Sequence, residues 1–263
     1  AGARACIAQP SRMHPDTIVA LLVLGALFGV LGGLVGIGGG IFAIPTLGIF
    51  FGLDQQHAQG TALVMVVPNV AIGLYNYAKR GTMDPKIGFA LALAALPATY
   101  LGARLATSLP SHELRILFGI FALAIALSMA ASALVATRVL RPRARAPWQA
   151  ATVIGAFGGG LSGLFGVGGA VFAVPILSVL YGISQATAQG FGLALVAPGT
   201  IVNLLTYGGA GDIDWPIGAL LAVGGLFTVR LGVGLAHRLP ERALRLVFAG
   251  LVLAGSVGVF RSS

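Results

Sequence analysis

The chain alternates long apolar runs with short polar segments, and this pattern predicts its elements. Polar turns such as Lys79-Arg80-Gly81 and Leu109-Pro110-Ser111 separate the runs. A membrane-spanning helix needs about 20 apolar residues. We therefore expect an all-α fold, that of a polytopic membrane protein. The charge-poor runs of suitable length are 17–51, 58–78, 87–107, 115–137, 149–181, 188–208, 216–236 and 243–260.

Two of these runs are too long for one ordinary span. Residues 17–51 as a straight helix would reach about 52 Å, whereas the hydrocarbon core of a bilayer is about 30 Å thick. A glycine cluster lies in the middle of this run, and another lies in the run 149–181. Because glycine adopts backbone conformations closed to other residues, a helix can break at each cluster. The pattern predicts broken or re-entrant helices at both places.

The chain also resembles itself at a fixed offset. Residues 130 positions apart match at Gly33 and Gly163, Gly36 and Gly166, Pro45 and Pro175, Gln59 and Gln189, Pro68 and Pro198, Tyr77 and Tyr207, and Asp84 and Asp214. We interpret the match as a duplication into two homologous repeats of four to five helices each. Residues 13–137 then form the first transmembrane repeat and 148–263 the second. A basic linker, 138–147, joins them, and 1–12 form an N-terminal extension.

The relative orientation of the two repeats depends on what each glycine cluster does. If each long run crosses the membrane once, the repeats have four spans and are parallel. If each cluster turns the chain back, the repeats have five segments and are inverted. The positive-inside rule compares Lys and Arg on the two sides. It gives ten against six in the first case and eleven against five, with both termini outside, in the second. Both arrangements remain open at this point.

Composition supports a membrane location and excludes several classes of protein. Hydrophobic residues make up 57% and charged residues 9%, whereas about a quarter of the residues of a soluble domain are charged. Residues 146–211 contain no Asp, Glu, Lys or Arg. A soluble enzyme, a nucleic-acid-binding domain and a disordered chain are therefore excluded, and no nucleic acid partner is expected. Basic residues cluster between apolar runs, as in cytoplasmic loops, so we expect a multi-pass protein of the cell membrane, the bacterial inner membrane.

No constellation of residues predicts catalysis. His14, His57, His112 and His237 lie in loops or near termini, and no nucleophile has a base on its segment. The sequence has no Walker motif for ATP and no ligand spacing for a metal. We expect no enzyme, no cofactor and no metal site.

The glycine clusters are instead the predicted anion site. Helices that resume near Ile41 and Val171 would direct free N–H groups and positive dipole ends towards a cavity. Two such termini at the midplane form an uncharged site that holds an anion weakly enough to release it. The alternative is that these glycines only allow close helix packing, the role we assign to Gly25 and Gly29. The predicted site glycines are Gly36, Gly38, Gly39, Gly40, Gly166, Gly168 and Gly169.

Few polar side chains lie near the clusters, and each has an alternative role. Gln59 and Gln189 can donate amide N–H groups to an anion, or cap or join helices. Asn69 and Asn203 can bind substrate or satisfy carbonyl groups freed by Pro68 and Pro198. Arg230 lies inside an apolar run, where it can attract substrate or extend its guanidinium to the headgroups.

Residues near the ends of the spans complete the set of candidates. Thr61 is a binding candidate without a polar counterpart in the second repeat. Tyr77 and Tyr207 are expected to be interfacial anchors. Asp84 and Asp214, the acids present in both repeats, can carry a coupling proton or cap a helix.

These motifs resemble a known family. Gly-Gly-Leu-Val-Gly-Ile-Gly-Gly-Gly at 32–40, followed by Ile44-Pro45 and Ala58-Gln59-Gly60-Thr61-Ala62, resembles the TauE/SafE family of membrane transporters. The resemblance extends from Met13 to about Phe260. The second repeat departs from the pattern with Ala170 in place of Gly40.

The family is implicated in export or uptake of sulfite, sulfonates and related anions. The resemblance implies a secondary transporter that moves a small sulfur-containing oxyanion across the cytoplasmic membrane by alternating access. The alternative is an anion channel, or a permease for another small organic anion. The expected partners are the anionic substrate, membrane lipid and a coupling ion, either a proton or sodium. Oligomeric state stays open, with a homodimer as one alternative.

Overall fold

The protein is a bundle of α-helices. The computed structural model describes residues 14–79, 83–135, 147–167, 169–236, 238 and 250. Within these ranges all regular structure is helical, in the order α1 (Pro15–Val35), α2 (Gly40–Phe51), α3 (Gln55–Ala78), α4 (Pro85–Ser108), α5 (Ser111–Val135), α6 (Gln149–Phe165), α7 (Ala170–Tyr181), α8 (Gln185–Ala210) and α9 (Trp215–Ala236). The predicted N-terminal extension and nearly all of the basic linker and of the run 243–260 lie outside the described residues.

Helix length and surface agree with a membrane environment. In the part of the chain that the structure describes, six helices are long and apolar enough to cross a bilayer: α1, α3, α4, α5, α8 and α9. Large apolar side chains are exposed on the outside of the bundle, including Val23 on α1, Leu101 on α4 and Phe227 on α9. An apolar exterior is stable only in lipid. The prediction of an all-α membrane protein is confirmed.

Both long apolar runs break at their glycine clusters, as expected. Helix α1 ends at Val35, its C-cap Gly36 has a left-handed φ of 76°, and α2 begins at Gly40. Helix α6 likewise ends at Phe165, its C-cap Gly166 has a φ of 65°, and α7 begins at Ala170. Each short helix has 12 residues, about 18 Å at 1.5 Å per residue. This is too short to cross the membrane.

Close contacts between glycines and neighbouring backbone give the direction of each helix. Gly25 of α1 lies against Leu221 of α9, and Gly33 lies against Val229, so α1 and α9 are parallel. In α9, Gly218 lies against Thr61 and Gly225 against Asn69, so α3 runs the same way. Since α1 and α3 share one direction, α2 carries the chain back between them. The first glycine cluster therefore reverses the chain.

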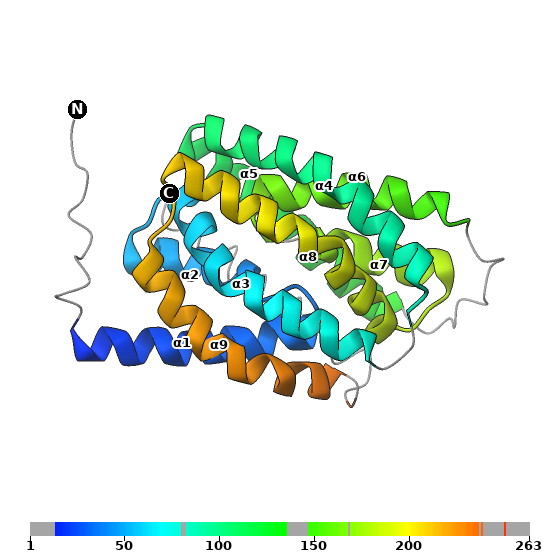
Figure 1. The fold of residues 1–263 in the computed structure, drawn as a ribbon, viewed down its shortest axis with the longest axis horizontal. Helices are drawn as coiled ribbons and strands as arrows, with labels where there is room; N and C mark the ends of the chain where they lie inside the picture. The colour runs from blue at the N-terminus through cyan, green and yellow to red at the C-terminus, as the bar shows by residue number, and fades with distance from the viewer. Residues whose placement is uncertain are drawn as a thin grey trace.

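Helices α4, α6 and α8 run in the opposite direction. Gly155 and Gly163 of α6 lie against Leu91 and Thr99 of α4, so these helices are parallel. Gly199 of α8 also lies against Thr99, whereas Tyr77 near the end of α3 bonds Gln189 near the start of α8. Helices α4, α6 and α8 are thus antiparallel to α1, α3 and α9. Figure 1 shows α1 with α9 along one edge of the bundle, α4 with α6 along the other, and α3 and α8 between them.

Candidate functional site

The two helix breaks meet in the buried centre of the bundle. A Cβ atom placed on Gly40, at the start of α2, would lie 3.4 Å from the carbonyl oxygen of Gly166 and 3.6 Å from the Cα of Val167. Gly36 lies against Gln189 and Gly166 against Gln59, so each break also contacts the helix beyond the opposite break. We call this region the glycine junction. It consists of Gly36–Gly40, Gly166–Val167 and Gly169, with Gln59, Tyr77, Gln189 and Tyr207.

The backbone geometry at the junction places the N-terminus of α2 in the buried centre of the bundle. Gly38 and Gly39 have φ of 75° and 93°, values that strongly favour glycine. The first intrahelical bonds of α2 run from the N–H groups of Phe42 and Ala43 to the carbonyl of Gly39. The N–H groups of Gly40 and Ile41 precede these bonds, as expected at a helix N-terminus. The start of α2 therefore has the partial positive charge that favours an anion.

Helix α7 begins with the same bonding pattern. Phe172 and Ala173 donate to the carbonyl of Gly169 at 3.1 and 2.9 Å. Gly169 has a φ of −62°, so its small size, and not its backbone conformation, is what the structure requires. A Cβ placed there would lie 1.7 Å from the carbonyl oxygen of Gly158. The predicted site residue Gly168 lies outside the described residues.

Two glutamine–tyrosine pairs connect the N-terminal and C-terminal parts of the chain. The hydroxyl of Tyr77 donates to Oε1 of Gln189 at 2.7 Å, and that of Tyr207 donates to Oε1 of Gln59 at 2.6 Å. Each hydroxyl also lies near a helix carbonyl, that of Gly33 at 3.4 Å or Gly163 at 3.3 Å. Both glutamines therefore join helices, the structural role considered for them.

The tyrosines are not interfacial anchors, and that prediction is wrong. Tyr77 is 2% exposed and Tyr207 is fully buried. Their positions near helix ends suggested the membrane interface, but the side chains turn into the junction, where buried amides accept their hydroxyl protons. Trp148 and Trp215, which are exposed at the starts of α6 and α9, have the surroundings expected of anchors.

The two amide nitrogens of the glutamines differ in their partners. Nε2 of Gln189 donates to the carbonyl of Leu34 at 3.3 Å. Nε2 of Gln59 is fully buried and has no hydrogen-bond partner. A buried donor without a partner costs about 1–3 kcal/mol. Gln59 is thus a free donor beside the glycine junction, and Gln189 is a satisfied one.

Asn69 and Asn203 bond to carbonyl groups near the breaks. Nδ2 of Asn69 donates to the carbonyl of Gly38 at 3.4 Å, and Nδ2 of Asn203 donates to that of Ser162 at 3.0 Å. Neither bond is to a carbonyl freed by Pro68 or Pro198, so the proline-related role considered for them is wrong. Their Oδ1 atoms are buried without a partner.

The remaining predicted residues lie away from the junction. The hydroxyl of Thr61 accepts the backbone N–H of Asp214 at 2.9 Å, at the start of α9. Asp84 accepts the N–H of Lys86 at 2.9 Å, and Asp214 accepts that of Ile217 at 3.1 Å, so both aspartates cap helices. Arg230 is exposed on the outer face of α9.

A titratable cluster was missed by sequence reasoning. Nδ1 of His57 lies 3.0 Å from Oδ1 of Asp54 and 3.7 Å from Oδ1 of Asp212. Burial raises the pKa of Asp212, and Asp54 raises it further, while His57 acts in the opposite direction. Asp54 and His57 have the spacing of a helix cap, but nothing in the sequence places Asp212 beside them. Among the described residues, no group of three or more His, Cys, Asp or Glu side chains could hold a metal ion.

Comparison with known proteins gives one consistent family. The family model described as sulfite exporter TauE/SafE matches residues 21–259. A probable membrane transporter protein of Methanocaldococcus jannaschii is 30% identical over 247 residues, which cover 90% of each chain. One of Xylella fastidiosa is 31% identical over 263 residues, 94% of this chain and 96% of the relative. TauE/SafE family protein 5 of Arabidopsis thaliana, named a sulfite exporter, is 30% identical over 104 residues, 39% of this chain and 23% of the relative.

Proposed function

The chain belongs to the TauE/SafE family of membrane transporters, and from this premise we propose that it moves a small sulfur-containing oxyanion across the cell membrane. Sulfite is the substrate that the family description and the name of the plant relative give, and small sulfonates present similar anionic oxygens. The transport is secondary and proceeds by alternating access. The glycine junction is the binding site.

The observation that carries this proposal is the free amide of Gln59. A buried N–H donor without a partner is unfavourable, and an oxyanion supplies an acceptor for it. The start of α2 offers further N–H groups at the same junction, where its Gly40 meets Gly166. Sulfite and sulfonate present oxygens that can accept from several such donors together. Neutral donors of this kind hold an anion without a fixed positive charge.

The absence of a fixed positive charge at the described junction residues suits a transporter. A guanidinium buried beside an anion would bind it tightly and release it slowly, because their attraction is strong in a low-dielectric interior. Helix N-termini and amide groups give weaker and shorter-range stabilisation. Arg230 and Thr61 stay outside the proposed site. Arg230 is exposed on the outer face of α9, and the hydroxyl of Thr61, buried in α3, accepts the backbone N–H of Asp214.

We further propose that the two parts of the chain are inverted repeats of one ancestral unit, and that alternating access arises from their exchange of conformation. The opposite directions of α1 and α6, of α3 and α8, and of α9 and α4 support this proposal. The paired bonds of Tyr77 to Gln189 and Tyr207 to Gln59 support it as well. Inverted repeats of this kind place the substrate between them near the midplane.

Anion flux into proteoliposomes tests the site at Gln59. Gln59→Met keeps the size of the side chain and removes its amide. We expect the sulfite concentration for half-maximal flux to rise by about tenfold or more, since a hydrogen bond to a charged group contributes about 1.5–3 kcal/mol. Size-exclusion profiles and helical content confirm that the variant folds.

Tyr207→Phe is the matched control. It removes the hydroxyl bonded to Oε1 of Gln59 but leaves Nε2 in place. We expect a clearly smaller effect than that of Gln59→Met. Equal effects of the two variants would assign Gln59 a structural role only, and normal flux in Gln59→Met would exclude the junction as the site.

The same assay separates a transporter from a channel. A secondary transporter accumulates the anion against its gradient when a proton or sodium gradient is imposed, and its rate saturates. Passive flux alone would favour the alternative of an anion channel. Asp84 and Asp214 remain the coupling candidates, and loss of the response to a proton gradient in Asp84→Asn or Asp214→Asn would support that role.

A further inference from the structure

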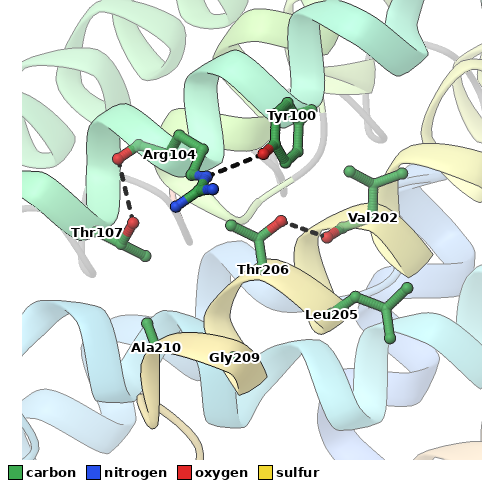
Figure 2. Close-up of a pocket in the computed structure, with 8 residues that line it drawn as sticks. All are labelled: Tyr100, Arg104, Thr107, Val202, Leu205, Thr206, Gly209 and Ala210. Atoms are coloured by element: carbon green, nitrogen blue, oxygen red, sulfur yellow. Dashed lines mark hydrogen bonds between the residues drawn. The ribbon is translucent and has the colours of Figure 1, made fainter.

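A groove between α4 and α8 contains an arginine that forms no ion pair with a described carboxylate. The groove has a volume of about 460 Å³ and opens on the outer face of the bundle. Figure 2 shows Tyr100, Arg104 and Thr107 on its α4 side and Leu205, Thr206 and Gly209 on its α8 side. None of these residues belongs to the glycine junction, and the buried Tyr207 points from α8 into that junction instead.

The guanidinium of Arg104 is held in place by Tyr100. Nε of Arg104 donates to the tyrosine hydroxyl at 3.0 Å, and its Cζ lies 5.5 Å from the centre of the ring. In the described part of the chain, no carboxylate forms an ion pair with Arg104. Its terminal N–H groups therefore remain available to an acceptor in the groove. Arginine is well suited to bidentate recognition of phosphate oxygens.

The hydroxyl groups of Thr107 and Thr206 already donate their protons to backbone carbonyl groups, so they are not available as hydrogen-bond donors to a ligand. Thr107 Oγ1 donates to the carbonyl of Arg104 at 3.1 Å, and Thr206 Oγ1 donates to that of Val202 at 2.8 Å. Their single protons are therefore used within their own helices. An anion in the groove would be recognised mainly by the Arg104 guanidinium, which Figure 2 shows facing α8.

The lining of the groove changes from cationic near the C-terminal ends of α4 and α8 to apolar farther along these helices. Tyr100, Val202 and Leu205 line the part of the groove that is farther from the C-terminal ends of α4 and α8, and Leu205 is 71% exposed. Arg104 and Gly209 lie closer to the ends of α4 at Ser108 and α8 at Ala210. Arg104 precedes the end of its helix by four residues, about 6 Å along the axis. Because α4 is long enough to cross a bilayer, a guanidinium this close to its end can reach the headgroup layer, with apolar surface extending towards the middle of the helix.

We propose that this groove binds one anionic phospholipid, with its phosphodiester on Arg104 and an acyl chain along Leu205. The groove opens sideways on the apolar exterior, where lipid is the neighbour, and its gradient from cationic to apolar matches the gradient within a lipid molecule. Position 234, which corresponds to Arg104 in the proposed second repeat, is glycine. One site per chain is therefore expected.

Native mass spectrometry of protein released from nanodiscs tests the proposal. The nanodiscs contain equal amounts of phosphatidylglycerol and phosphatidylcholine. We expect the wild-type protein to retain one phosphatidylglycerol in preference to phosphatidylcholine. Arg104→Gln should lower that preference by about tenfold, since it removes the charge-assisted hydrogen bonds to the phosphodiester. Equal retention of the two lipids by the wild type would overturn the proposal.

Two further variants separate the groove from general charge. Gly209→Leu fills the groove and keeps Arg104, and a Cβ at Gly209 meets no atom within 4 Å, so this variant should fold. It should lose the bound lipid as Arg104→Gln does. Arg115→Gln removes an arginine that does not line the groove, and it should retain the lipid. Lipid loss in Arg115→Gln equal to that in Arg104→Gln would overturn the assignment.

A soluble anion distinguishes lipid from free phosphate. Glycerol 1-phosphate carries the phosphate group without acyl chains. We expect millimolar glycerol 1-phosphate to leave the retained phosphatidylglycerol in place, because the apolar part of the groove contributes to lipid binding. Displacement of the lipid by this compound would instead make the groove a site for soluble anions.

Discussion

Single glycines differ in what they contribute, even where their backbone conformation is the same. Gly38 and Gly52 have φ of 75° and 65°. A Cβ on Gly38 would lie 2.6 Å from Cγ2 of Val70, whereas one on Gly52 would meet no atom within 4 Å. Gly38 therefore requires glycine both for its left-handed backbone and for its close packing against Val70. Gly52 requires glycine for its left-handed backbone alone. Stability measurements can therefore separate backbone strain from packing.

We predict that Gly52→Ala lowers the free energy of unfolding by about 1–2 kcal/mol, the cost of a left-handed residue with a side chain. Gly38→Ala should cost about 1–3 kcal/mol more because the methyl group overlaps Val70. Denaturant unfolding in detergent measures both. Equal losses would show that the junction is loosely packed at Gly38.

Larger substitutions at the junction test folding more than binding. A side chain at Gly39 would lie 2.6 Å from the carbonyl oxygen of Phe28, and one at Gly169 would lie 1.7 Å from that of Gly158. Helix backbone cannot move aside as a flexible side chain can. Loss of flux in Gly39→Leu or Gly169→Leu would therefore report misfolding. Gln59 is the better residue for a test of substrate binding.

Asp212 predicts a dependence of stability on pH. Its pKa is raised, mainly by burial, so the folded protein binds this proton more tightly than the unfolded chain does. The free energy of unfolding therefore declines as pH rises from the ordinary aspartate pKa through the raised value, and it stays lower above that window. Asp212→Asn removes the decline.

The measurement is the midpoint of thermal unfolding in detergent. At neutral pH the Asp212→Asn variant should be more stable than the wild type, and below the ordinary aspartate pKa the two should agree. Asp16→Asn, which changes a side chain that is 98% exposed, is the control. A constant difference between Asp212→Asn and wild type at all pH values would contradict the interpretation.

At the scale of elements, glycine allows helices to pack backbone against backbone. Gly25, Gly29 and Gly33 of α1 lie against α9, and Gly155, Gly159 and Gly163 of α6 lie against α4. In lipid, helices associate through such close packing because apolar side chains gain little by leaving an apolar solvent. The packing role predicted for Gly25 and Gly29 is confirmed. Glycine in this chain thus serves both interfaces and breaks.

We predict that Gly29→Leu lowers the free energy of unfolding by about 3 kcal/mol or more, the upper range for overpacking. A Cβ at this position would lie 2.7 Å from the Cα of Gly225. Gly160→Leu on α6 is the matched control, since a Cβ there meets no atom within 4 Å, and it should cost much less. Comparable losses would mean that helix propensity, and not the α1–α9 interface, controls stability.

At the scale of the whole molecule, the connections between helices gather at two ends. Asp212 lies beside His57, and Nε2 of Gln56 donates to the carbonyl of Leu109 at 2.7 Å. The α2–α3, α4–α5 and α8–α9 connections therefore share one end, the Asp54 end. Met83 lies against Gly190 at the opposite end, the Lys79 end. Among the basic residues that the structure describes, Lys79, Lys86 and Arg238 lie towards the Lys79 end, whereas Arg104 and Arg115 lie towards the Asp54 end.

The positive-inside rule then predicts that the Lys79 end is cytoplasmic. In a variant without the single cysteine, Cys6, we introduce cysteine at exposed Lys79 or exposed Ser108. A membrane-impermeant maleimide added to intact cells should label the Ser108→Cys protein. The Lys79→Cys protein should react only after the cells are opened. The reverse pattern of labelling would invert the proposed orientation.

The sequence by itself determined the class of the protein and the places where its helices break. Low charge and runs of about 20 apolar residues require a membrane, because only lipid stabilises so much apolar surface. The clusters at Gly36–Gly40 and after Gly166 predict breaks, since local backbone freedom is a property of the residues themselves. Tertiary structure alone decided the direction of each helix and the partners of the buried polar groups. Tyr77 and Gln189, like His57 and Asp212, meet across more than 100 residues of chain, and such contacts depend on how whole helices pack.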